Sequence, residues 1–193
     1  MEGNFDNLKD KELVEATLKD REVFTYLVKR YETQLTRYIW RTGAKDHEEV
    51  KDILQESFVK IYINLNDYDP TLSFGAWIYR ITHNETINYF RKQKNRPKTF
   101  IHENDLILFD MIPDELDIVD EHTKKFEKKA ILEALETVPQ KYKDVLVLRF
   151  FEDKSYDEIS DILEIPSGTV ATYINRGKTA LKEILLHSRA LDI

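Results

Sequence analysis

Residues 155–185, SYDEISDILEIPSGTVATYINRGKTALKEIL, contain two helical patterns separated only by the short stretch EIPSG. Ser155 and Glu158 have the S-x-x-E spacing of a capping box, which predicts that the first helix begins there. Pro166 ends that helix, and Ser167 is suited to cap the next one. The stretch is therefore a tight pair of helices. It forms either one corner of a helical core or a helix-turn-helix whose second helix enters DNA.

The second helix of this pair has an apolar face and a polar face. Apolar or small residues recur every three or four positions and predict one buried stripe, formed by Val170, Ile174, Gly177, Leu181 and Leu185. A glycine in this stripe predicts close approach of a neighbouring helix. The polar face suits base edges and phosphates in a major groove, and it is formed by Thr169, Thr172, Tyr173 and Arg176. The geometry of this segment alone leaves both interpretations open.

The distribution of charge is more informative than its total. The 193 residues have a formal net charge of −7, which is unusual for a nucleic-acid-binding protein. Residues 101–122, however, contain eight acidic residues and no Lys or Arg, whereas residues 80–98 contain six basic residues and Glu85 as the only acid. A further basic group follows Pro166. This segregation predicts two basic surfaces joined by an acidic connector.

The composition excludes several classes of protein. There is no Cys, which rules out disulfides and thiolate metal sites and agrees with a reducing cytoplasm. No apolar run approaches a membrane span, and the acidic N-terminal residues do not form a signal peptide. The five His are not at metal-ligand spacing, and no Gly-rich phosphate loop occurs. We expect a cytoplasmic protein that is not an enzyme, has no cofactor or metal, and does not insert directly into a membrane.

The rest of the chain predicts helices and a linker. A long helix is indicated by apolar residues at helical spacing, namely Leu27, Tyr31, Leu35 and Tyr38. Gly43 is placed to end it, and Ser73 is placed to cap a later helix over residues 74–94. The expected fold class is all-α, with two small helical bundles joined by an acidic linker and the helix-turn-helix in the second bundle. The expected boundaries are 1–97 for the N-terminal domain, 98–127 for the linker and 128–193 for the C-terminal domain.

Two predicted helices of the N-terminal half carry candidate binding surfaces. In VKDILQESFVKIY (residues 50–62) a polar face lies apart from the apolar stripe and consists of Asp52, Gln55 and Glu56. The helix over residues 74–94 has a single stripe that changes character along its length. It begins with the apolar Trp77, continues with the amides Asn84 and Asn88, and ends with the basic Arg91. Amides beside a basic end suit base recognition, but each face is also compatible with a solvated surface.

Four segments, taken in order, resemble a bacterial RNA polymerase sigma factor of the extracytoplasmic-function (ECF) subfamily. They are DREVFTYLVKRY (20–31), VKDILQESFVKIY (50–62), FGAWIYRITHNETINYFRKQK (74–94) and the stretch from VPQKYKDVLVLRFFEDK through the helix pair (138–185). No single motif is decisive, but the matches are collinear over most of the chain. The resemblance implies a protein that binds core RNA polymerase, directs it to specific promoters and promotes transcription initiation.

The resemblance also implies roles for particular residues. Polymerase binding is implied for Asp52, Gln55, Glu56 and Phe58. Reading of the minus-ten promoter element is implied for Tyr68 in the loop NDYDPTLSF and for Asn84 and Asn88. Contact with the DNA backbone upstream is implied for Arg91, Lys92 and Lys94. Contact with the minus-thirty-five element is implied for Thr169, Thr172, Tyr173 and Arg176. Lys178 lies off that face and is expected to contact phosphate.

Further expectations follow from the same resemblance. The partners would be core RNA polymerase, promoter DNA and an anti-sigma factor, and the acidic linker would occupy the nucleic-acid channel of the polymerase. Many relatives have basic residues at the positions of Ala171 and Tyr173, so the minus-thirty-five contacts are expected to be less ionic here. Trp77 is expected in the core rather than in promoter melting. The alternative function is a stand-alone helix-turn-helix repressor or activator with a helical sensing domain.

Overall fold

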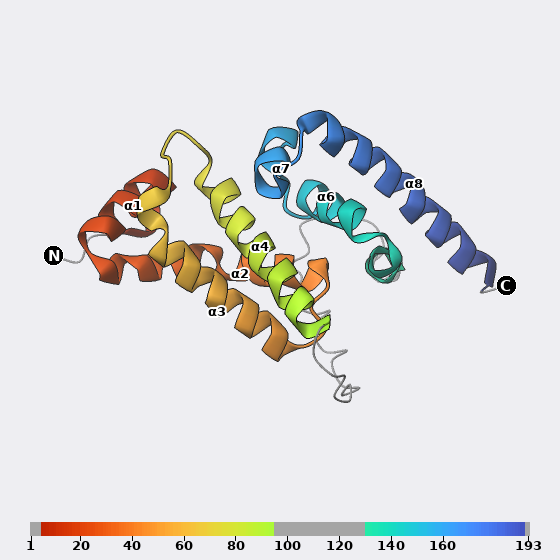
Figure 1. The fold of residues 1–193 in the computed structure, drawn as a ribbon, viewed down its shortest axis with the longest axis horizontal. Helices are drawn as coiled ribbons and strands as arrows, with labels where there is room; N and C mark the ends of the chain where they lie inside the picture. The colour runs from red at the N-terminus through yellow and green to blue at the C-terminus, as the bar shows by residue number, and fades with distance from the viewer. Residues whose placement is uncertain (1–4, 95–129, 192–193) are drawn as a thin grey trace.

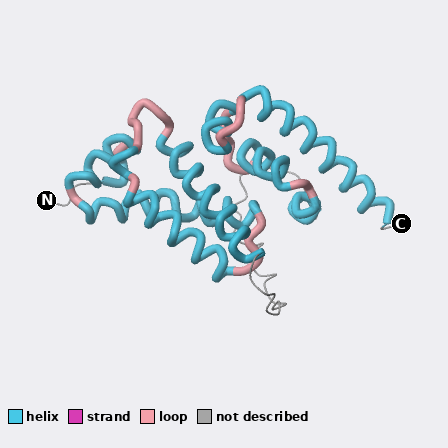
Figure 2. Tube along the Cα trace, viewed as in Figure 1, coloured by secondary structure: helices cyan, strands magenta, loops and turns pink. Residues whose placement is uncertain are grey.

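The computed structural model describes residues 5–94 and 130–191, and these ranges contain helices and no strand, as Figure 1 and Figure 2 show. The predicted all-α fold class is confirmed. The predicted linker, 98–127, lies outside the described residues. The α-helices are α1 (Asp10–Lys19), α2 (Phe24–Thr42), α3 (His47–Ile63), α4 (Phe74–Lys94), α6 (Gln140–Phe150), α7 (Tyr156–Leu163) and α8 (Ser167–Leu191), with a further helical segment at 130–137. The short 3-10 turns are η1 (Phe5–Asn7), η2 (Arg21–Val23) and η3 (Leu65–Asp67).

The ends of the N-terminal helices follow from residues close in sequence. Gly43 follows α2 with φ of +128°, a conformation that an L-residue rarely adopts. The Asp46 side chain accepts a hydrogen bond from the Glu49 amide and so caps α3. The Ser73 hydroxyl accepts from the Ala76 amide at 3.2 Å, which confirms the predicted start of α4. These local signals fix the direction in which each helix enters the bundle.

The two halves of the chain pack against each other through one hydrophobic cluster. Helix α4 packs against α7, and α2 packs against α6. The cluster contains Leu35 and Ile78 from the first half together with Leu148 and Ile159 from the second, all at most 1% exposed. The sequence predicted two bundles on a tether. The structure adds that the described parts of both bundles share a core.

Buried polar contacts also join the two halves. Glu152, in the turn between α6 and α7, accepts hydrogen bonds from the Arg41 guanidinium at 2.7 Å and from the Tyr79 hydroxyl at 2.6 Å. The side chains of Arg41 and Glu152 are only 10% and 4% exposed. Burial raises the pKa of Glu152, although Tyr79 and Arg41 oppose this effect. A carboxylate buried this deeply requires both partners to remain in place.

The helix-turn-helix pair forms as the sequence predicts, with small differences. Ser155 and Glu158 make the capping box of α7, and Glu164 ends that helix in the left-handed conformation with φ of 53°. Helix α8 begins at Ser167 itself, one residue earlier than predicted, and the Ser167 hydroxyl donates to Asp157 at 3.3 Å. A Cβ atom at Gly177 would lie 3.0 Å from the Leu146 side chain of α6, which confirms the predicted close approach.

Candidate nucleic-acid interface

The polar face of α3 is open to solvent. Asp52, Gln55 and Glu56 are all exposed, while Ile53 on the opposite side is 1% exposed. This separation arises because the apolar positions of α3 pack towards α2 and α4. The acidic and amide groups are therefore available to a partner protein without any rearrangement of the core.

Phe58 does not share that open face. Its ring is half-buried against the hydrophobic cluster and meets Phe24 edge-on, with the ring centroids 6.4 Å apart. The ring therefore supports the packing of α3 on α2. Whether Phe58 also contacts a partner stays a prediction from the resemblance.

Tyr68 lies in the loop before α4 but points into the core. It is 8% exposed, and its ring packs between Phe74 and Trp77 at centroid distances of 5.0 and 5.5 Å. Its hydroxyl donates to the Leu72 carbonyl at 2.7 Å, and burial raises its pKa. Tyr68 thus shapes the loop in this conformation and does not present its ring to a base. Trp77 is 8% exposed and belongs to the hydrophobic core, as expected.

The C-terminal half of α4 presents the predicted amide and basic side chains. Asn84, Arg91 and Lys92 are exposed, and Asn88 is half-buried. The side chain of Lys94 lies outside the described residues. This half of α4 combines amide groups with fixed positive charge, the two chemistries that base edges and phosphates require.

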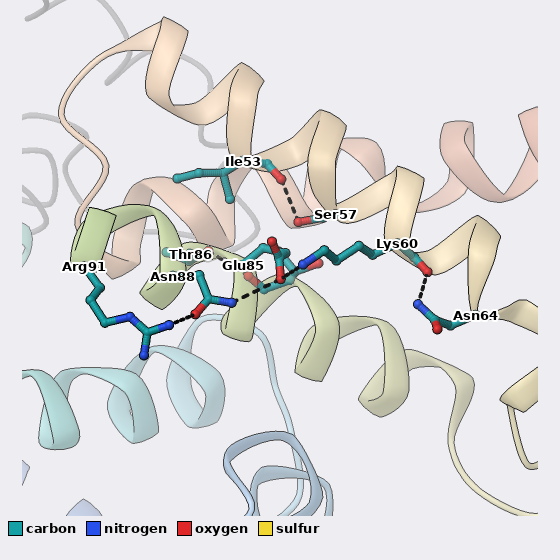
Figure 3. Close-up of polar contacts among 9 residues, drawn as sticks. Ile53, Ser57, Lys60, Asn64, Glu85, Thr86, Asn88 and Arg91 are labelled. Carbon is teal, nitrogen blue, oxygen red and sulfur yellow. Dashed lines mark hydrogen bonds and ion pairs between the residues drawn. The ribbon is translucent and has the colours of Figure 1, made fainter. Parts of the chain in front are cut away.

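The amide of Asn88 belongs to a chain of polar contacts that crosses from α3 to α4, as Figure 3 shows. Its Nδ2 donates to Oε1 of Glu85 at 3.3 Å, and its Oδ1 accepts from the Arg91 guanidinium at 2.8 Å. The same Glu85 oxygen accepts from the Lys60 ammonium at 2.7 Å. Neither Lys60 nor Glu85 was among the predicted site residues. The position of Glu85 as the only acid among residues 80–98 was the signal available.

The outward face of α8 contains most of the residues predicted for it. Thr172 and Arg176 are exposed on this face and Thr169 is half-buried, whereas Lys178 is exposed on another side of α8. Asn175 was not among the predicted residues. It is exposed and lies three positions from Thr172, so both share one side of the helix. An amide there adds a donor and an acceptor suited to adenine. The spacing that placed Thr172 and Arg176 on this face was also sufficient to find Asn175.

Tyr173 lies at the edge of this face and packs against α6. It is half-buried, and its ring meets Tyr142 edge-on at a centroid distance of 5.5 Å. The Lys141 ammonium lies 5.0 Å from the Tyr142 ring centroid and 5.6 Å from that of Tyr173. A hydrogen bond from Arg176 lowers the pKa of Tyr142. The structure thus adds Lys141 and Tyr142 to the basic and aromatic surface around α8.

The described residues contain no cluster of metal ligands. No group of three or more His, Asp or Glu within them is arranged to hold a metal ion. His83 is partly buried and makes a 2.8 Å hydrogen bond with the Tyr38 hydroxyl, and burial lowers its pKa to about 4. At neutral pH His83 is therefore uncharged. Over the same residues no helix has the length and hydropathy that crossing a bilayer requires.

Comparisons with known protein families match two separate segments of the chain. Residues 27–96 match the family described as Sigma-70 region 2, and residues 128–181 match Sigma-70, region 4. Together the two matches cover about two thirds of the chain. They include α3, α4 and the helix-turn-helix in the expected order. This order does not favour a stand-alone repressor.

Similar proteins extend over nearly the whole chain. The ECF RNA polymerase sigma factor SigW of Bacillus subtilis is 29% identical over 186 residues, covering 91% of this chain and 95% of that protein. The ECF RNA polymerase sigma-E factor of Haemophilus influenzae is 28% identical over 197 residues, covering 92% and 95%.

Two solved structures have a similar fold. One is CnrH in complex with the cytosolic domain of CnrY, with a TM-score of 0.66, 22% identity, and coverage of 91% of this chain and 96% of that chain. The other is the sigma factor RpoE in complex with the anti-sigma factor NepR from Bartonella quintana, with a TM-score of 0.64, 18% identity, and coverage of 84% and 96%. At this level of identity the two structures support the helical architecture.

Proposed function

As a member of the sigma-70 family of RNA polymerase sigma factors, of the ECF type, this chain directs RNA polymerase to promoters, and we propose that it does so through three separate helical surfaces. The first is the exposed face of α3, formed by Asp52, Gln55 and Glu56, which would bind core polymerase. The second is the C-terminal half of α4, which would read the minus-ten element. The third is the outward face of α8, which would read the minus-thirty-five element.

The chemistry of each surface fits its proposed partner. The α3 face is acidic and rigidly supported, so it suits a basic protein surface. On α4, Asn84 and Asn88 would contact bases while the exposed Arg91 and Lys92 hold the backbone. On α8, Thr172, Asn175 and Arg176 would contact base edges, and Lys178 would contact phosphate. Phe58, Tyr68 and Tyr173 would support these surfaces through packing.

The proposed domain assignment follows the two family matches. Residues 1–97 would bind polymerase and the minus-ten element, residues 98–127 would connect, and residues 128–193 would bind the minus-thirty-five element. The protein would act in the cytoplasm, where promoters and polymerase are found, and its role would be regulatory rather than enzymatic. We further propose an anti-sigma factor as a partner, which is supported by the complex of the similar RpoE with NepR.

A single observation carries this proposal. The region 2 match contains an exposed polar face on α3 that a DNA-binding protein without polymerase does not require, and it precedes a complete helix-turn-helix. The test is in vitro transcription from a pool of genomic fragments with bacterial core polymerase, with and without the protein. We expect a defined set of new transcripts that depend on both components. DNA binding of equal strength and sequence choice without polymerase would instead support the repressor.

A further inference from the structure

Glu85 is the only acid between Arg80 and Lys98, and it lies on the helix proposed to read the minus-ten element. It is 8% exposed, so an ionised carboxylate here is costly unless it is paired. The Lys60 ammonium supplies that pairing from α3 at 2.7 Å, with its side chain 41% exposed. Lys60 thus offsets a buried negative charge on the helix that is proposed to contact the DNA backbone.

The same Glu85 oxygen fixes the orientation of the neighbouring Asn88 amide. A carboxylate only accepts hydrogen bonds and a guanidinium only donates them. Asn88 lies between the two, so its Nδ2 faces Glu85 at 3.3 Å and its Oδ1 faces Arg91 at 2.8 Å, as Figure 3 shows. The opposite orientation of the amide would place donor against donor and acceptor against acceptor. The two neighbours therefore select one orientation of Asn88.

This network leaves the amide able to contact a base. Nδ2 has two hydrogens, of which Glu85 takes one, and Oδ1 has two lone pairs, of which Arg91 takes one. One donor and one acceptor remain, which is the pair that bidentate recognition of adenine uses. The side chain is only half-buried, so part of it is accessible at the surface of α4.

We propose that Glu85 is a positioning residue, which holds the Asn88 amide in the one orientation that reads a minus-ten base, while Lys60 neutralises Glu85. This inference rests on the proposed function and identifies a residue of that site which the comparisons do not assign. Glu85 acts through Asn88 and does not itself contact DNA. Its loss should therefore change which base is preferred more than it changes overall stability.

The test uses the full chain, saturating core polymerase and a promoter library randomised at the minus-ten element, with transcripts sequenced. Glu85→Gln is nearly isosteric but offers both a donor and an acceptor, so it no longer selects one orientation of Asn88. We expect a loss of about fivefold or more in base preference at one minus-ten position. Asn88→Ala should lose preference at the same position, and adding Glu85→Gln to Asn88→Ala should change the preference no further.

Lys60→Gln is the matched control, because it removes the same ion pair but leaves the hydrogen bond between Glu85 and Asn88. We expect it to lower transcription evenly across minus-ten sequences. The inference is overturned if Glu85→Gln and Lys60→Gln change the base preference equally. It is also overturned if Asn88→Ala changes the preference and Glu85→Gln does not. Thermal melting of each variant separates loss of fold from loss of reading. If Glu85→Gln unfolds, a changed preference in Lys60→Gln overturns the inference and an unchanged one supports it. Absence of polymerase-dependent transcripts with the wild-type chain would overturn the proposed function itself.

Discussion

Replacing Glu152 by Ala is expected to weaken the contact between the two halves of the protein. Glu152 accepts from Arg41 of α2 and from Tyr79 of α4, at 2.7 and 2.6 Å. Its removal leaves a guanidinium that is 10% exposed without its counter-ion. It also leaves the buried Tyr79 hydroxyl without this acceptor. Water reaches neither donor readily, so the loss is not compensated by solvation.

The geometry sets the size of the effect. Removing one partner of a buried ion pair costs roughly 3 to 5 kcal/mol, and the low exposure of Arg41 and Glu152 places this pair in that class. The matched control is Arg30→Ala on α2, the helix that also carries Arg41. Arg30 pairs with Asp10 at 2.8 Å, but the two side chains are 25% and 34% exposed. That substitution is expected to cost under about 1 kcal/mol.

The assay is urea unfolding followed by circular dichroism, combined with small-angle scattering of each variant in buffer. Glu152→Ala should lower the unfolding free energy and increase the radius of gyration, because it loosens the interface and not a single helix. A double-mutant cycle with Arg41→Ala should give a coupling energy above about 1 kcal/mol. The reasoning is refuted by a coupling energy near zero, or by a cost for Glu152→Ala no larger than that for Arg30→Ala.

Three further predictions concern the surfaces and the pH dependence. Joint replacement of the exposed Gln55 and Glu56 by Ala should abolish most binding to core polymerase and shift stability by under about 0.5 kcal/mol. Lys178→Ala should weaken transcription evenly across promoter sequences and reduce its salt dependence by about one charge. Arg176→Ala should instead change the preferred minus-thirty-five sequence, with a loss of roughly 1 to 3 kcal/mol of discrimination at one base. Burial raises the pKa of Asp144 from 3.8 to about 7. Between these two values the folded state holds a proton that the unfolded state releases, so the unfolding free energy falls as pH rises from about 4 to about 7. Asp144→Asn should therefore be more stable than the wild type at pH 8, by up to about 4 kcal/mol, with little difference below pH 4.

Each of these predictions has a distinct contradicting result. Unchanged co-elution of the Gln55 and Glu56 double variant with polymerase would remove the α3 surface from the proposal. Identical sequence preferences for Arg176→Ala and the wild type, beside a lowered melting temperature, would make that part of α8 structural. If urea unfolding gives the same difference in unfolding free energy between Asp144→Asn and the wild type from pH 4 to pH 8, Asp144 is ionised in the folded state.

The sequence by itself determined the helices and the faces of the helices. The cap of α4 by Ser73, the capping box of α7 and the end of α2 at Gly43 each depend on residues at most four positions apart. The exposed faces of α3 and α8 follow from periodicity, because a residue's side of a helix is fixed by its number alone. The need for a small residue at Gly177 was also readable, since the apolar stripe passes through it.

Only the tertiary structure decided which side chains meet. The contact between Arg41 and Glu152 joins residues 111 positions apart, and that between Lys60 and Glu85 joins residues 25 positions apart. The resemblance implied that Tyr68 reads the minus-ten element, but the packing of its loop turns the ring into the core. Such contacts depend on how elements approach each other in space. Spacing along the chain specifies the face that a residue occupies but not the partner that the face will meet, so packing alone established the Glu85 network and the shared core.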